Sequence, residues 1–156
     1  MRKLILSLWI CCLFVFILNA CAYSNIQKGE NVSILILESY RNESISPFNS
    51  TIEEALIRGE NWPGDPVLIV MNLFKVTDLE TPYMSMTKEN DPGENPNRTT
   101  ITVFRDGFLD DSVRGDWHYF ELRKMNDQGW RFTEIRRAFL CRRGIQTEKL
   151  GKELCP

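Results

Sequence analysis

His118 is the only histidine in the chain, so a catalytic triad or a histidine-rich metal site would have to include it. It lies between Trp117 and Tyr119 in a strand-like run, and the sequence contains no Gly-x-Ser-x-Gly nucleophile motif and no glycine-rich phosphate loop. Adjacent Asp110 and Asp111 could supply acid-base chemistry, but such acids near glycine are more typical of turns and caps. These residues favour a structural histidine in a protein that is not an enzyme and holds no cofactor or metal.

Arginines are concentrated near the C-terminus, and they could bind an anion. Residues 21–113 contain 15 acidic and 7 basic side chains, whereas residues 114–156 contain 6 acidic and 10 basic ones. This pattern suits lipid head groups, glycan phosphate or an acidic protein better than nucleic acid, because an overall acidic protein lacks the broad positive footprint that nucleic acid needs. Internal ion pairing with the acidic residues is the alternative. The candidate anion-binding residues are Arg131, Arg136, Arg137, Arg142 and Arg143.

The N-terminus has the layout of a secretory signal peptide. Arg2 and Lys3 precede an apolar run without charges, from Leu4 to Leu18. This run is shorter than the roughly 18 to 20 residues that a membrane-spanning helix needs, which disfavours an uncleaved anchor helix. We therefore expect residues 1–20 to be removed as a signal peptide.

Leu18-Asn19-Ala20-Cys21 follows this run and resembles the lipobox of bacterial lipoproteins. In that motif a branched apolar residue and a small residue precede the cysteine, whose thiolate is suited to forming a thioether with lipid. The resemblance implies a lipoprotein anchored to a membrane through Cys21 and bearing fatty acids such as palmitate. Cleavage after Ala22 would instead release a soluble secreted protein. In such lipoproteins an acidic residue after the lipidated cysteine signals retention in the inner membrane. Because Ala22 is neutral, the resemblance implies the periplasmic side of the outer membrane in a Gram-negative cell.

Two cysteines remain after the signal peptide and the lipidation site are set aside. Cys141 and Cys155 form an even pair in a chain expected in an oxidising compartment, which predicts a disulfide bond. A metal site is the alternative, but neither cysteine belongs to a Cys-x-x-Cys motif or lies near the histidine in sequence.

After the predicted lipidation site, residues 21–30 resemble a polar tether, and residues 31–156 suit one globular domain. The apolar segment at residues 32–40 is too short to assign by periodicity and fits a strand or a short helix packed on the core. The mature sequence also resembles the many small envelope lipoproteins whose role is uncharacterised, although no family motif in it matches residue by residue.

Two helices are expected in the first half of this domain. One spans residues 49–59, with Ser50 or Thr51 as the N-cap and Gly59 as the stop. In the next segment, Asp65-Pro66 is typical of a helix start, while the β-branched residues in Val67–Val70 are typical of a strand. The capping pair favours a buried helix.

The second half predicts an antiparallel meander. A turn-forming loop at residues 89–97 precedes three β-rich runs, at residues 98–107, 116–125 and 130–141, with a turn at residues 126–129. In the last run the even-numbered residues Trp130, Phe132, Ala138 and Leu140 are expected on one inward face. Ile135 and Phe139 break this alternation, so both faces of the sheet are expected to be partly covered.

Together these elements predict an α+β domain with N-terminal helices packed on one face of a curved antiparallel sheet. The element order is similar to that of cystatin-like and nuclear-transport-factor-like domains, which implies nothing about function. We expect a lipid-anchored, non-catalytic envelope protein that serves as a binding or accessory module through its sheet surface or its arginines. The alternative is a domain that holds a small ligand in a pocket lined by Trp117, Phe120, Trp130 and Phe132.

Overall fold

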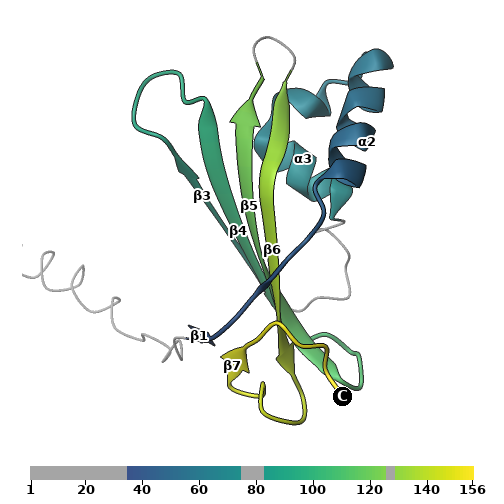
Figure 1. Ribbon diagram of the computed structural model, residues 1–156, viewed down its shortest axis with the longest axis vertical. Helices are drawn as coiled ribbons and strands as arrows, with labels where there is room; N and C mark the ends of the chain where they lie inside the picture. Colours follow the sequence, from purple (N-terminus) through teal and green to yellow (C-terminus); the bar gives the residue numbers. More distant parts are fainter. Residues whose placement is uncertain (1–34, 75–82, 126–128) are drawn as a thin grey trace, which may run out of the picture. The chain divides into compact units, whose positions relative to one another are not determined.

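Within the described part of the chain, the main sheet has five strands in the order β2-β6-β5-β4-β3, and all neighbours are antiparallel (Figure 1). The computed structural model describes residues 35–74, 83–125 and 129–156. Together with two α-helices, this sheet makes the domain α+β, as predicted. The elements are, in chain order, β1 (Ile36–Leu37), β2 (Arg41–Asn42), α2 (Ser46–Ile57), η1 (Trp62–Gly64), α3 (Pro66–Leu73), β3 (Tyr83–Asn90), β4 (Arg98–Asp106), β5 (Val113–Lys124), β6 (Trp130–Cys141) and β7 (Lys149–Leu150).

Several sequence predictions lie outside the described residues. These are the signal peptide, the lipobox with Cys21, the tether to residue 30 and residues 126–128 of the predicted turn. Of the segment expected as a first strand or helix, residues 36–37 form β1, which pairs in parallel with β7 in a separate small sheet. Leu35, just before β1, packs on a buried cluster described below.

Helix α2 begins earlier than predicted. It starts at Ser46, with Pro47 in its first turn, and Ile45 occupies the N-cap position without a side-chain hydrogen bond. Proline is favoured there because its fixed φ suits a helix and its missing N–H has no intrahelical partner. The predicted stop at Gly59 is confirmed, since this residue follows the C-cap residue Arg58 and takes a φ of 74°. Asn49 binds both the N–H and the C=O of Phe132 through its side-chain amide, which ties α2 to β6.

Helix α3 confirms the helix prediction for the segment after Asp65. The Asp65 carboxylate accepts hydrogen bonds from the N–H of Val67 at 2.7 Å and of Leu68 at 3.4 Å. Pro66 occupies the first turn. A local capping signal therefore outweighed the β-branched composition of the segment.

The meander is confirmed at β4, β5 and β6, but it has one strand more than predicted. β3 occupies residues 83–90, so Glu89 and Asn90 end a strand and only residues 91–97 form the loop into β4. Most β3 side chains are exposed and only Met86 packs on the core-face cluster, so the segment lacks the longer apolar pattern that identified β4, β5 and β6.

A β-bulge in β6 changes which residues share a face. Glu134 pairs with Glu121 and Phe132 pairs with Leu122, so Thr133 has no opposite residue on β5. One extra residue shifts the alternation of side chains along the strand by one position. The expectation that four even-numbered residues share one face was therefore wrong.

Two buried clusters lie on the two faces of the sheet, as the broken alternation indicated. The larger one joins Ile52 of α2 and Ile69 of α3 with the sheet residues Ile101, Phe120 and Phe132. We call the face that carries these sheet residues the core face, and the opposite one the open face. The smaller cluster lies on the open face and is formed by Ala138, Leu140 and Leu150, with Leu35, Phe104 and Trp117 packed against it.

The C-terminal segment returns to the end of β6. Cys141 and Cys155 are bonded, which confirms the predicted disulfide. Phe139 and Gly151 exchange both backbone hydrogen bonds, at 2.8 and 3.0 Å. The disulfide and this bridge fix the tail against the sheet.

Candidate binding surface

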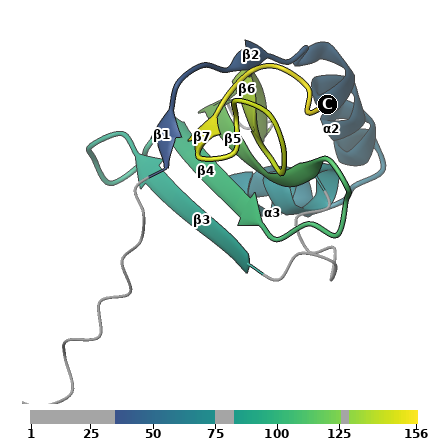
Figure 2. The ribbon, with the colours of Figure 1, turned by 90° about the horizontal axis from the view of Figure 1, so that it is seen from below.

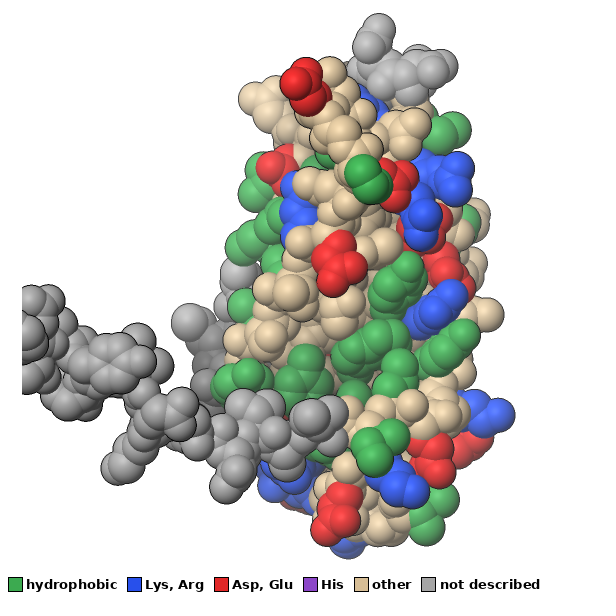
Figure 3. Space-filling model, turned by 90° about the vertical axis from the view of Figure 1, so that its left-hand side faces the viewer, with side chains coloured by type: hydrophobic (Ala, Val, Ile, Leu, Met, Phe, Trp, Pro, Cys, Tyr) green, Lys and Arg blue, Asp and Glu red, His purple; other side chains and the backbone are tan. Residues whose placement is uncertain are grey.

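The open face carries a group of side chains that we call the aromatic surface: Tyr40, Tyr83, Phe104, Trp117, Tyr119 and Arg136. Strand register brings them together, because Phe104 is directly opposite Trp117 and Tyr119 is directly opposite Arg136. Tyr83 of β3 contacts Phe104 with ring centroids 6.1 Å apart. Figure 3, which views the molecule from the β3 side, shows hydrophobic side chains gathered in a band across its lower half.

Arg136 lies between two aromatic rings of this surface. Its guanidinium carbon is 4.7 Å from the ring centroid of Tyr40 and 4.9 Å from that of Tyr119. The same guanidinium donates two hydrogen bonds, of 2.7 and 2.8 Å, to the carboxylate of Glu134. Hydrogen bonding to Glu134 raises the pKa of Arg136 above its ordinary value. The arginine is therefore held in place and its charge is compensated within the surface.

The tryptophan of the aromatic surface is supported by a buried cluster of the sheet. Trp117 packs on the open-face cluster of Ala138, Leu140 and Leu150, and its ring stacks on Tyr119 with centroids 6.2 Å apart. Tyr40 and Tyr83 remain 41% and 53% exposed. The surface thus combines a tryptophan supported by buried residues with two exposed tyrosines.

The other half of the open face is polar. Glu121 forms an ion pair with Arg98 at a nitrogen–oxygen distance of 3.1 Å, and it accepts a hydrogen bond from the Thr133 hydroxyl at 3.0 Å. Arg123 also approaches the Glu121 carboxylate, at 3.7 Å. Since these charges are paired with one another, the aromatic half is the part of this face that offers unused apolar contact.

On the core face, β5 contributes a buried carboxylate. Asp116 is fully buried and accepts two hydrogen bonds of 2.8 Å from Arg105, one of 3.0 Å from Arg137 and one of 2.9 Å from His118. Burial alone would raise the pKa of Asp116, but the hydrogen bonds from His118 and Arg105 outweigh it and hold the pKa far below its ordinary range. A carboxylate with four donors is a poor base. Gly115 precedes it, and the Arg105 carbonyl leaves no room there for a Cβ.

His118 is a buried, neutral partner of this carboxylate. Burial lowers its pKa more than hydrogen bonding to Asp116 raises it. A carboxylate only accepts, so Nε2 carries the proton and Nδ1 keeps the lone pair. Nδ1 has no hydrogen-bond partner among the described residues, and the Phe74 and Phe120 rings lie 5.7 and 5.6 Å from the imidazole. No nucleophilic side chain in the described structure is therefore activated by this histidine.

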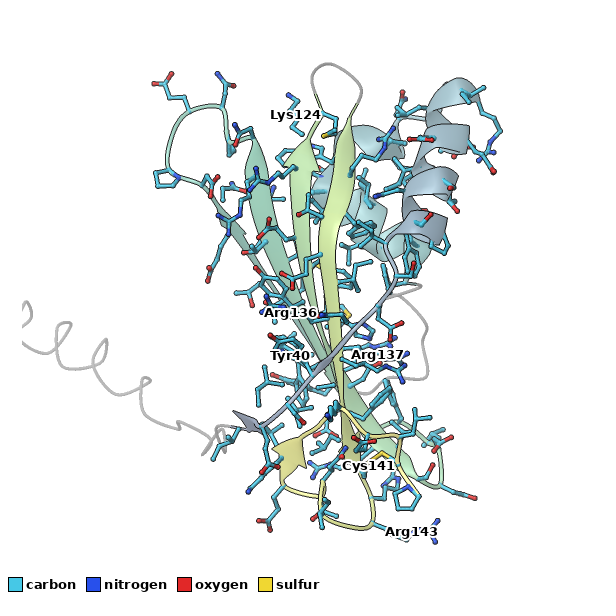
Figure 4. All side chains as sticks on the ribbon, in the orientation of Figure 1. Tyr40, Lys124, Arg136, Arg137, Cys141 and Arg143 are labelled. Atoms are coloured by element: carbon cyan, nitrogen blue, oxygen red, sulfur yellow. A yellow bond between two sulfur atoms is a disulfide. The ribbon has the colours of Figure 1, made fainter. Side chains whose placement is uncertain are left out.

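The five arginines singled out from the sequence do not share one surface. Arg136 and Arg137 are neighbours in β6 and point to opposite faces, and Figure 4 shows Arg143 at the far lower end. Arg131 lies 3.7 Å from Glu53 of α2. Arg142 donates to the backbone carbonyls of the loop between β4 and β5, at Phe108 and Asp110, and Arg143 donates to Asp111 in the same loop.

The four aromatic residues of the alternative pocket are also separated. Phe120, Trp130 and Phe132 lie in the core-face cluster, whereas Trp117 lies on the open face. This arrangement does not bring the four rings to one ligand site.

Sequence reading missed the aromatic surface for a physical reason. Trp117 and Tyr119 are two residues apart in a strand, which places them on one face. Tyr40 and Tyr83 come from segments whose positions depend on long-range pairing, and no local pattern reports it. Asp116 was missed as well, because its three partners come from three strands.

The described residues contain no group of three or more His, Cys, Asp or Glu side chains that could hold a metal ion. Within the same ranges no helix has the length and apolar character needed to cross a membrane. Comparisons with protein-family models, curated proteins and solved structures gave no significant match.

Proposed function

We propose that this chain is a lipid-anchored, non-catalytic protein of the cell envelope that binds another protein through its aromatic surface. The single observation that supports the binding role is that aromatic rings lie together on the open face with Arg136, which is held by Glu134 and two of the rings. Tyr, Trp and Arg are the residues that dominate binding energy at protein interfaces. An exposed apolar group with polar neighbours is also typical of interaction sites.

The rigidity of this surface supports the same role. Trp117 rests on a buried cluster and Arg136 is held by Glu134 and two rings, so few side chains would lose freedom on binding. Ordering a flexible side chain at an interface costs roughly 0.5–1.5 kcal/mol, and a surface that is already ordered avoids most of that cost.

The charges favour a protein over an anionic ligand as the partner. Arg136 is already paired with Glu134, and Arg137 and Arg142 donate to groups of this chain. An anion would therefore have to compete with partners that are already in place. We therefore propose a protein partner in place of the lipid head groups or glycan phosphate that the sequence analysis considered for the arginines.

The buried centre supports a role without catalysis. Asp116 is saturated with donors, and the free nitrogen of His118 faces no nucleophile in the described structure. General base catalysis needs a group whose pKa lies near the working pH, and the lowered pKa of Asp116 is unsuited to it.

The location is inferred from the sequence. The signal peptide at residues 1–20 and the lipobox ending at Cys21 support a lipid anchor, and residues 21–30 would tether the domain to the membrane. The disulfide between Cys141 and Cys155 fits an oxidising compartment such as the periplasm. In a Gram-negative cell we propose the periplasmic side of the outer membrane.

Co-purification of the tagged full-length chain from the envelope of cells that produce it tests the binding role. Replacing Tyr40 and Tyr83 together by serine removes two exposed rings of the aromatic surface, and Leu68→Ser on α3, where Leu68 is 44% exposed, is the matched control. We expect the bound protein to be lost from the tyrosine variant and retained by the control. Equal retention by both variants would contradict the proposed surface.

A further inference from the structure

β3 forms a long edge of the sheet. It is the last strand in the sheet order, and it pairs with β4 over all eight of its residues without a register shift. The opposite edge is β2, which has two residues. Figure 2 shows β3 at one margin of the sheet and β2 at the other.

The backbone of β3 offers alternate residues to a further strand. Asp91, just past the end of β3, donates its N–H to the Arg98 carbonyl at 3.1 Å, so Asp91 and Arg98 form a hydrogen-bonded pair. Hydrogen-bonded and non-hydrogen-bonded pairs alternate along an antiparallel ladder, so every second pair before this one is also hydrogen-bonded. The residues between them direct their N–H and C=O away from β4. These are Met84, Met86, Lys88 and Asn90, and no strand in the described part of the chain pairs with that side.

This edge lacks two of the usual features that prevent strand pairing and carries few charges. It contains no proline and no bulge, and its charged side chains are Lys88 and Glu89 alone. Tyr83 and Met84 are 53% and 44% exposed. A long, regular, exposed edge of this kind is a template for pairing with another strand.

We propose that β3 pairs with β3 of a second copy of this chain, antiparallel and about a two-fold axis at Thr87. In this register Met84 faces Asn90 of the second copy and Met86 faces its Lys88. All four outward residues are then hydrogen-bonded, and Thr87 faces Thr87 of the second copy, a favourable cross-strand pair. The two sheets become one continuous sheet.

The charges and the length of β3 disfavour the neighbouring registers. An axis at Lys88 or at Glu89 would place like charges directly opposite each other, which is destabilising. An axis at Met86 would leave Asn90 beyond the end of the paired segment. The strand is therefore complementary to itself, which favours a second copy over an unrelated peptide as the occupant. This inference does not depend on the proposed function.

Disulfide trapping in the full-length chain tests the register. At a non-hydrogen-bonded antiparallel pair the two Cα atoms are about 4.5 Å apart, a distance that a disulfide can bridge. Thr87→Cys should therefore give a covalent dimer under mild oxidation. Ser85→Cys is the matched control, because the two Ser85 positions would lie about 14 Å apart along the strands. The yield of dimer is compared with that of wild-type protein oxidised in parallel, because Cys21 of the full-length chain can itself form a disulfide when it carries no lipid.

Charged substitutions at Thr87 provide the second test. Thr87→Lys and Thr87→Glu each place like charges about 5 Å apart and should weaken self-association by at least about fivefold in sedimentation experiments. An equimolar mixture of the two variants should associate again. The proposal is overturned if Thr87→Cys gives no more covalent dimer than wild type, if Ser85→Cys gives as much dimer, or if both charged variants associate like wild type.

Discussion

Removing the negative charge of Asp116 should destabilise the domain strongly. In Asp116→Asn, an amide replaces a fully buried carboxylate that accepts four hydrogen bonds, and its NH₂ group would face donors. Arg105, 15% exposed, would then have no counter-charge. Breaking a buried ion pair by removing one partner costs about 3–5 kcal/mol. Arg137 is 32% exposed and can recover hydration, so we expect the lower end of that range.

A loss of about 3 kcal/mol corresponds to a decrease in Tm of roughly 10 °C for a domain of this size. Thermal and urea unfolding followed by circular dichroism measure both quantities. Asp106→Asn is the matched control, because Asp106 makes a similar two-bond pair with Arg114, which is 45% exposed. Exposed pairs contribute less than about 1 kcal/mol. Equal losses in the two variants, or no loss in Asp116→Asn, would refute the assignment of Asp116 as the buried ionic centre.

Three further outcomes are expected. Reducing the bond between Cys141 and Cys155 should lower the free energy of unfolding by about 3 kcal/mol, because the disulfide closes a short loop in the unfolded chain. Urea unfolding with and without reductant measures this difference. Stability should fall as the pH drops below about 6.5, because His118 becomes protonated in the unfolded chain while burial keeps its imidazole neutral in the folded protein. His118→Gln should flatten that dependence; an unchanged slope would argue against it. Cys21→Ser should abolish labelling by radioactive palmitate, and a mutant that is still labelled would contradict the anchor.

Features encoded by a few adjacent residues could be predicted from the sequence. Asp65 and Pro66 were sufficient to predict α3, because a carboxylate that binds the first N–H groups and a proline in the first turn act locally. The meander from β4 to β6 followed from β-rich runs between turn residues. The disulfide followed from counting cysteines in a chain that we expect to be exported.

Features that depend on distant residues could not be predicted. The side chain of Asn49, at the start of the expected helix, binds the backbone of Phe132 on β6, and α2 begins before it. The extra residue Thr133 interrupts the alternation of β6, and nothing in its own type indicates a bulge. The placement of Arg136 and Arg137 on opposite faces shows why five nearby arginines do not make one site.

Site-specific photocrosslinking tests the central claim, that the aromatic half of the open face is the binding surface. A photoreactive phenylalanine derivative would replace Tyr119 in one full-length variant and Arg123 in another, two residues on the same strand and the same face. In envelopes of cells that produce the protein, we expect a defined adduct from position 119 and little or none from position 123. Adducts of equal yield at both positions, or at position 123 alone, would contradict the account.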